Sequence, residues 1–386
     1  MIKGMSVRGR ISALVYSIAA LLLFVYSYTQ VDLSLTLSQV SIWQTIQKQL
    51  QYIGYFNRPL STVIFLLILA VLFILYGVVV RFIRTKELNR RDLWVIIAAI
   101  TIVTVLSYPA FSYDFFNYLF TSKTVLIYHK NPYTVIPLQF SGVEPWLSFM
   151  HWTHLPTAYT PVWIIYTLIP FIFGFGYFLF RMWNLKLFIA AAYLFTAWGI
   201  GKILEKEDKQ NATLGVAIFA LNPLIITECL VSPHNDIVMM ALAIGSMLIY
   251  QRGKHLASWF VLSLSVAMKL MTIFLIPAFF MKWRRPFALV CMMIGFVAVL
   301  TQRDVLSWYW VWVVPFVALV PDIRQLTVIS TGVSLGLLLR YAPFLYFGNW
   351  NDPVPRLMAW GTWIPVAAAL FIVLTPIAGK KLFPRT

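Results

Sequence analysis

Long apolar runs separated by short basic segments set the pattern of this chain. A helix needs about 20 mostly apolar residues to cross a bilayer, and the first such runs lie at roughly 11–28, 61–82 and 93–110. Polar residues fill 30–59, where we expect a short helix on the membrane surface. Residues 111–160 are the longest stretch without a spanning run, and their many aromatic residues favour short helices at the interface.

This pattern predicts an all-α polytopic membrane protein, a bundle of about ten or eleven transmembrane helices. We expect a single transmembrane domain, 1–386: three spans in 1–110, an outer loop with interfacial helices in 111–160, and the remaining spans in 161–386.

Two stretches do not fit simple crossings. Between Arg252 and Lys282 there are too few residues for two full spans, so we expect two shorter helices that meet near Lys269. Broken helices are tolerated at membrane depth only where they line a polar cavity. From Asp114 to 234–236, three apolar runs stand where topology requires an even number of crossings, and our interpretation is that 161–180 does not cross fully.

Composition strengthens the membrane interpretation. Hydrophobic residues make up 61% and charged residues 11%, against roughly 45–50% and roughly 25% in globular proteins. The formal charge of +17 would suggest nucleic acid in a soluble protein. Here most basic residues fall in the turns between spans, and basic turns mark the cytoplasmic side. Nucleic acid is therefore not an expected partner, whereas membrane lipids are.

The same charges predict an orientation. Both termini lie inside, while the segments after Asp114, at 231–236, at 302–310 and at 349–355 lie outside, in what we expect to be a prokaryotic plasma membrane. Cys229 and Cys291 both lie in apolar runs, which argues against a disulfide framework or a cysteine-based zinc site.

Asp114 is the first candidate for chemistry, because an ionisable residue at membrane depth is costly and usually functional. It follows a span directly and has aromatic neighbours. Such a carboxylate can act as a general base toward a hydroxyl, or it can simply cap a surface helix. His151 and His154 lie later in the same loop, but their spacing matches no metal motif. No metal site is predicted, although a divalent metal cofactor is left open.

A second group of polar residues follows. Glu228 interrupts an apolar run and should face protein or a cavity, while the sequence HND at 234–236 suits hydrogen bonding to sugar hydroxyls or the start of a helix. Lys269, at membrane depth, needs a carboxylate or phosphate partner. Arg303 precedes a tryptophan-rich stretch that forms either an interfacial aromatic belt or a platform for a sugar, with Arg303 near a phosphate.

Taken in order, these motifs resemble the integral-membrane glycosyltransferases of the GT-C fold, in particular the polyprenol-phosphate-mannose-dependent mannosyltransferases. The resemblance covers roughly 90–320 and is carried by Asp114, NPY at 131–133, YTP at 159–161, Glu228 with HND at 234–236, Lys269, and WYWVW at 308–312. The first 90 and the last 60 residues carry no motif of this kind.

The resemblance implies transfer of a sugar, mannose by default, from a polyprenyl-phosphate-linked donor to a lipid, glycan or protein acceptor at the outer face. It implies that Asp114 is the catalytic base of an inverting displacement and that Lys269 and Arg303 bind the donor phosphate. The residues implied to bind sugar or acceptor are Asn131, Tyr133, Tyr159, Glu228, His234, Asn235, Asp236, Trp308 and Tyr309. Many relatives carry paired acids where this chain has Tyr113 and Asp114, which leaves metal dependence and the exact donor open.

Two other classes of function compete with this hypothesis. A transporter or flippase of a lipid-linked sugar would often carry inverted repeats, and the sequence has no evident internal repeat. A non-catalytic membrane subunit would need Lys269 and Glu228 to pair with each other.

Overall fold

The computed structural model describes residues 4–375. Lys3, Lys380, Lys381 and Arg385, which contributed to the predicted inside position of both termini, lie outside the described residues. The described chain is helical throughout and contains no strand, which confirms the predicted all-α polytopic class. Both cysteines in it are free and buried.

Within residues 4–375, five helical segments are long and apolar enough to cross a membrane. They are α1 with the short turn after it (Val7–Gln30), α3 (Arg58–Arg84), α7 (Phe178–Glu205), α15 with α16 (Arg324–Phe347) and α17 (Val354–Leu374). A sixth span results if Lys209–Ala220 and Pro223–Val231, bent by 55° at their junction, count as one. The prediction of ten or eleven transmembrane helices exceeds this number, and the shorter apolar helices among the described residues have 10–17 residues.

The shorter elements fill the rest of the body and the outer lobes. They are α2 (Ser41–Gln51), α4 (Arg90–Val105), α5 (Asp114–Leu126), α6 (Pro161–Ile172), α8 (Lys209–Ala220), α9 (Pro223–Ile226), η5 (Thr227–Val231), α10 (Asp236–Tyr250), α11 (His255–Met268), η6 (Leu270–Leu275), α12 (Ile276–Phe280), α13 (Arg285–Leu300), η7 (Ser307–Trp312) and α14 (Val314–Ala318). α15 ends at Leu339, and α16 covers Tyr341–Phe347.

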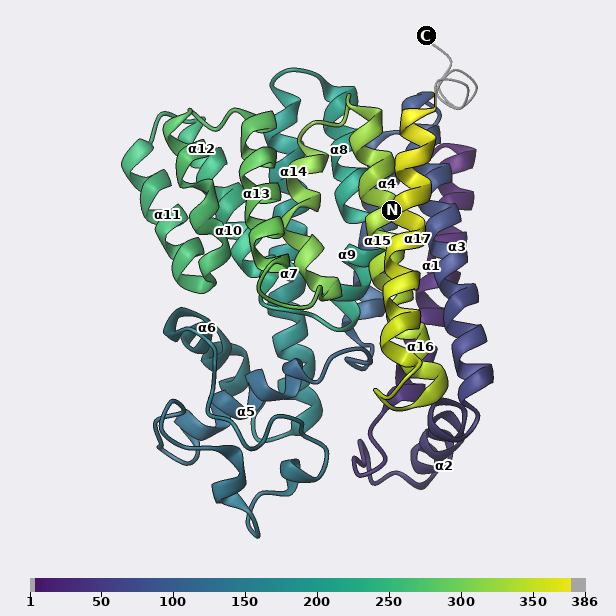
Figure 1. The fold of residues 1–386 in the computed structure, drawn as a ribbon, viewed down its shortest axis with the longest axis vertical. Helices are drawn as coiled ribbons and strands as arrows, with labels where there is room; N and C mark the ends of the chain where they lie inside the picture. The colour runs from purple at the N-terminus through teal and green to yellow at the C-terminus, as the bar shows by residue number, and fades with distance from the viewer. Residues whose placement is uncertain (1–3, 376–386) are drawn as a thin grey trace.

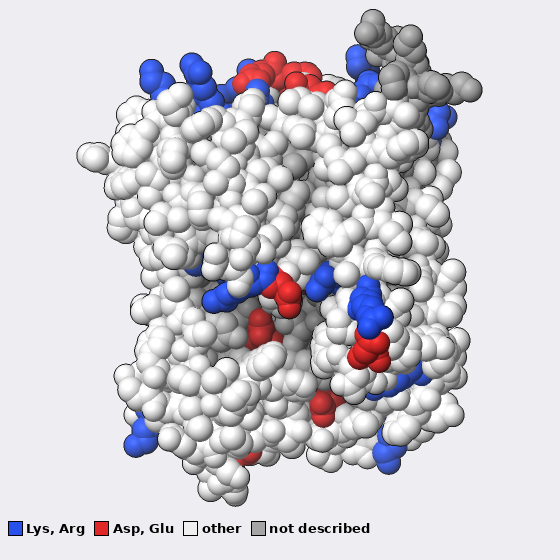
Figure 2. Space-filling model, in the orientation of Figure 1, with Lys and Arg blue, Asp and Glu red and all other residues white. Residues whose placement is uncertain are grey.

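The molecule consists of an upper body of near-parallel helices and two lobes below it (Figure 1). In the body, α1 packs on α4, α7 on α8 and α10, α10 on α11, and α15 on α17. One lobe holds α5 and α6, and the other holds α2, the helix expected in 30–59. Charged side chains on this face gather at the top edge and at mid-height and leave an uncharged band between them (Figure 2).

α6 accounts for the odd number of apolar runs between Asp114 and 234–236. It has 12 residues, too few to span a bilayer, and it packs against α5 and α7 in the lower lobe (Figure 1). Between Asp114 and 234–236, the candidate membrane crossings are then α7 and the bent pair of α8 with Pro223–Val231. Two crossings satisfy the requirement for an even number. The interpretation that 161–180 does not cross fully agrees with this arrangement.

The break predicted near Lys269 is confirmed. α11 ends at Met268, and Lys269 itself is extended, with φ −161° and ψ 130°. The chain then continues as η6 and α12. The break leaves Lys269 at the mid-height end of two short helices rather than on the side of a long one.

Lys186 of α7 holds together the ends of two other helices that stop at mid-height. Its buried ammonium donates to the carbonyl oxygens of Thr104, Ser107 and Val231, at 3.0, 2.5 and 3.0 Å, and to Ser107 Oγ at 2.7 Å. Carbonyls at a helix C-terminus lack intrahelical partners and carry partial negative charge. The lysine satisfies them at a depth where water cannot.

Candidate active site

Polar side chains from several elements meet at mid-height, where the body faces the lobe of α5 and α6. The start of α10, the end of α11 and η7 supply these side chains, together with the start of α5. At this level Figure 2 shows a hollow with basic and acidic side chains on its walls, while the surface above it is uncharged. The charged side chains of the central face are thus concentrated around one opening.

Asp236, Lys269 and Trp312 form the centre of the cluster. Lys269 Nζ lies 2.7 Å from Asp236 Oδ1, and the indole N–H of Trp312 donates to the same oxygen. The Asp236 side chain is 1% exposed and that of Lys269 29% exposed. Lys269 also donates to Asn235 Oδ1 at 3.4 Å. Because an ammonium has three donors, Lys269 can neutralise Asp236 and still offer a hydrogen bond to a ligand in the hollow.

Glu228 lies deeper, behind His234. The hydroxyl of Tyr341 donates to Glu228 Oε1 at 2.9 Å, and His234 Nδ1 lies 3.3 Å from Oε2. The His234 ring stacks on Trp308 with centroids 4.2 Å apart. The pairing of Glu228 with Lys269, which a non-catalytic subunit would need, is therefore wrong. Lys269 pairs with Asp236, and Glu228 fixes the position of His234 and Trp308.

Asp114 is the first residue of α5 and lies close enough to Lys269 and Asp236 for both charges to act on it. The N-cap position belongs to Tyr113, whose side chain makes no capping hydrogen bond, and the backbone N–H of Asp114 donates to Ser112 Oγ at 3.3 Å, so Asp114 does not serve as its N-cap. Burial raises the pKa of the Asp114 carboxyl, with Lys269 lowering it and Asp236 raising it. The charges of all three residues therefore act on one another.

One contact seats the lobe of α5 and α6 against the body beside this cluster, and a second contact links α5 to the same segment of the lobe. Thr160 Oγ1 donates to the carbonyl of Met268, next to Lys269, at 2.9 Å. On α5, the ring of Tyr118 packs edge-on against Tyr159, with centroids 4.7 Å apart. These contacts fix the distance between the start of α5 and the end of α11.

Arg303 lies at the outer rim, exposed in the loop between α13 and η7. Its guanidinium lies close enough to Tyr309 for its charge to act on the phenol, and the Tyr309 ring stacks on Trp312 with centroids 4.6 Å apart. Since Trp312 donates to Asp236, one chain of contacts leads from Arg303 at the rim to the central pair.

Asn131 and Tyr133 do not lie in the hollow. Asn131 Oδ1 accepts from the backbone N–H of Tyr133 at 3.0 Å, and the Tyr133 hydroxyl donates to the carbonyl of Tyr159 at 2.8 Å. Both residues are exposed in the outer loop. They hold the segment of Tyr159 in place from outside.

Sequence reasoning missed a second polar network on the other side of Tyr113. Tyr113 lies close enough to Tyr55 and Asp32 for both to act on its hydroxyl, and its ring stacks on His151 with centroids 3.8 Å apart. Asp32 and Tyr55 come from 30–59, where no motif was recognised. The signal was present, because Asp32 follows a span closely, as Asp114 does.

A buried ion pair inside the outer loop was also missed. Lys123 Nζ lies 2.7 Å from Glu144, and the Tyr128 hydroxyl donates to the same carboxylate at 2.7 Å.

Among residues 4–375, no group of three or more His, Cys, Asp or Glu side chains is arranged to hold a metal ion.

Comparison with protein families decides what kind of protein holds this cluster. The family model of the alpha-(1->6)-mannopyranosyltransferase N-terminal domain matches residues 13–285, well over half of the chain. The chain belongs to this mannosyltransferase family. No curated protein and no solved structure matches it.

The match confirms the resemblance drawn from the motifs and changes its extent. It includes Asp114, Asp236 and Lys269, and it also covers most of the first 90 residues, so Asp32 and Tyr55 lie within the family domain. It ends before Arg303 and the tryptophan-rich stretch. Membership supports a glycosyltransferase that moves mannosyl groups.

Proposed function

We propose that this mannosyltransferase takes mannose from a polyprenyl-phosphate-linked donor and transfers it to an acceptor hydroxyl, with Asp114 as general base. The observation that carries the proposal is that Asp114 lies near Lys269 and Asp236, close enough for both charges to act on its carboxyl. A carboxylate and a cation in one polar cluster are what the two ends of this reaction require.

In the reaction, the acceptor oxygen attacks the anomeric carbon and its proton passes to the Asp114 carboxylate. The bond from the anomeric carbon to the phosphate oxygen breaks, and a lipid phosphate leaves with the bonding electron pair. The raised pKa of Asp114 favours proton acceptance, because a general base works best with a pKa near the operating pH. Direct displacement inverts the anomeric configuration.

The cations stabilise the leaving group. Negative charge grows on the phosphate oxygen as the bond breaks, and preorganised donors at that point lower the barrier. Lys269 is held there by Asp236 and Asn235. Arg303 lies at the rim, on the contact chain through Tyr309 and Trp312.

The other predicted residues divide by depth. Asn235, Tyr159, Trp308 and Tyr309 line or border the hollow and bind the sugar or the acceptor. Glu228, His234, Asn131 and Tyr133 act through these by holding them in place. The acceptor is a lipid, glycan or protein hydroxyl.

The site opens on the non-cytoplasmic face of the plasma membrane, with both termini inside. Exposed basic residues of the turns after α10 and α12, including Arg252, Lys282 and Arg284, support this orientation, because basic turns favour the cytoplasm.

Transfer of labelled mannose from polyprenyl-phosphate mannose to mannosyl acceptors by the purified, reconstituted protein tests the proposal. We expect Asp114→Asn to lower kcat by about 10²–10⁴-fold, the usual contribution of a general base. Asp352→Asn removes an exposed outer carboxylate paired with Arg356 and serves as the matched control. Undiminished transfer by Asp114→Asn, or none by the wild type, would overturn the proposal.

A further inference from the structure

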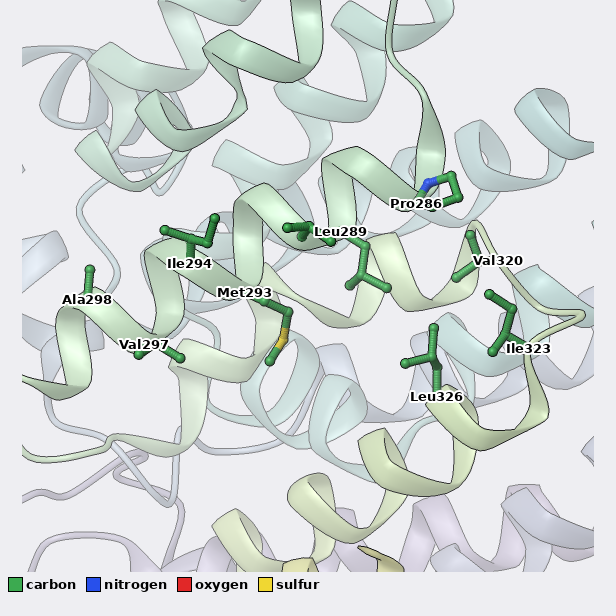
Figure 3. Close-up of a pocket in the computed structure, with 10 residues that line it drawn as sticks. Pro286, Leu289, Met293, Ile294, Val297, Ala298, Val320, Ile323 and Leu326 are labelled. Carbon is green, nitrogen blue, oxygen red and sulfur yellow. The ribbon is translucent and has the colours of Figure 1, made fainter. Parts of the chain in front are cut away.

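An apolar groove of about 620 Å³ runs along the outer face of α13 (Figure 3). One wall is α13 itself, including Leu289, Met293 and Val297. The other is formed by the turn between α14 and α15, with Val320 and Ile323, and by the start of α15, with Leu326. Every side chain that lines the groove is apolar.

We propose that this groove binds the polyprenyl tail of the lipid-phosphate donor and directs its phosphate toward Arg303. The inference deepens the proposed function and rests on it. It assigns the donor tail to one face of the protein, α13 and the α14–α15 turn.

Continuity with the polar cluster is the first argument. The groove reaches Ala298, near the end of α13, and the chain then turns into the loop that carries Arg303. The backbone N–H of Arg303 donates to the carbonyl of Val299 at 3.0 Å, so this cation is tied to the last turn of α13. A phosphate at Arg303 has the groove on one side and the contact chain through Tyr309 to Asp236 on the other.

The shape of the groove is the second argument. α14 has only five residues, and its early end leaves Val320 and the start of α15 to form a wall facing α13. From Pro286 to Ala298 the groove extends roughly 18 Å at 1.5 Å per residue. Its volume falls within the roughly 300–1,000 Å³ of small-molecule sites.

Charge distribution is the third argument. Exposed Arg303, with exposed Asp304 next to it, follows the end of α13, and the groove lining itself is apolar. This combination suits an apolar chain with one phosphate at its end. A polyprenyl tail gains no hydrophobic free energy when it moves from the lipid of the bilayer into an apolar groove. The groove must therefore select the tail by close packing, and close packing requires a shaped surface.

The test compares donors that differ only in tail length, a full-length polyprenyl-phosphate mannose and a ten-carbon analogue. Ile294 lines the groove and is 56% exposed, and Leu67 of α3, outside the groove, is 62% exposed. We expect Ile294→Trp to lower the preference for the long donor, measured as the ratio of the two kcat/KM values, about tenfold, equivalent to about 1.4 kcal/mol. Leu67→Trp should keep the wild-type ratio.

Photolabelling gives a readout that does not need turnover. A polyprenyl phosphate with a diazirine in its chain should label peptides of α13 and of the α14–α15 turn in the wild type, and should label them less in Ile294→Trp. The assignment would be overturned if the label appeared elsewhere in the protein. It would also be overturned if a diazirine phospholipid labelled the same peptides equally and polyprenyl phosphate did not displace it. An unchanged ratio of the two kcat/KM values in Ile294→Trp would contradict it as well. Absence of transfer by the wild type together with groove labelling would instead refute the proposed function alone.

Discussion

The Lys269–Asp236 pair offers the sharpest test of the arrangement, because its two members differ in burial. The side chain of Asp236 is 1% exposed and that of Lys269 is 29% exposed, with 2.7 Å between their charged atoms. Removing one partner of a fully buried pair costs about 3–5 kcal/mol, whereas exposed pairs contribute only about 0–1 kcal/mol. The two single substitutions should therefore be unequal.

We expect Lys269→Met to lower the free energy of unfolding by about 3 kcal/mol, because it leaves the Asp236 carboxylate buried without a cation. Asp236→Asn should cost only about 1 kcal/mol, since the amide oxygen can still accept from Trp312 and the freed ammonium can reach water. The double variant should cost less than the sum by about 1–2 kcal/mol, the usual coupling of residues in contact.

Reversible unfolding of the four proteins in mixed detergent micelles measures these values. If the two single substitutions cost the same, the stated difference in burial is wrong. If the losses add to within about 0.5 kcal/mol, the two groups are not coupled, and Lys269 is not held in place by Asp236.

Three further predictions follow from other contacts. Because burial raises the pKa of Asp114, kcat/KM should fall with decreasing pH in a range above the ordinary aspartate pKa of about 3.9. In Lys269→Gln the fall in kcat/KM should move to higher pH, because the cation that lowers the pKa of Asp114 is lost. In Asp236→Asn it should move to lower pH, because the anion that raises this pKa is lost. Shifts in the opposite directions in a pH–rate profile would contradict the stated effects of Lys269 and Asp236 on Asp114. Lys186→Met should cost about 3 kcal/mol or more of unfolding free energy, because several buried carbonyls lose their donor, whereas Lys202→Met, on the same helix but exposed, should change little; equal effects in detergent unfolding would refute the capping role. Lys123→Met should speed limited proteolysis of 128–160 by exposing the unpaired Glu144, while Lys130→Met, in the same loop, should not; identical cleavage rates would show that the ion pair does not hold the loop.

The sequence predicted a structural feature correctly where residue spacing and charge allow only one arrangement of helices. Too few residues separate Arg252 from Lys282 for two full helices, so the break at Lys269 could be predicted. The number of full-length helices could not, because a pass made of short pieces and a continuous helix have the same apolar composition. The 55° bend between α8 and α9 depends on packing with residues far away in the chain.

For the candidate site, residue types were predictable but pairings were not. Glu228 and Asp236 are eight positions apart, and either could have met Lys269. The choice depends on α10 starting at Asp236 and on Tyr341 reaching Glu228 from a helix more than a hundred residues later. Lys186 escaped notice because its partners are backbone carbonyls, which no side-chain motif reveals.

The short helices beside the hollow affect the bilayer around the protein. α11 and α13 have 14 and 16 residues, or roughly 21 and 24 Å at 1.5 Å per residue, against a hydrocarbon core of about 30 Å. The membrane on this side must thin by roughly 6–9 Å, at a cost of fractions of a kcal/mol per Å. Lipid headgroups then lie nearer the end of α13, so the lipid-phosphate donor of the proposed function would reach Arg303 without being lifted out of the membrane.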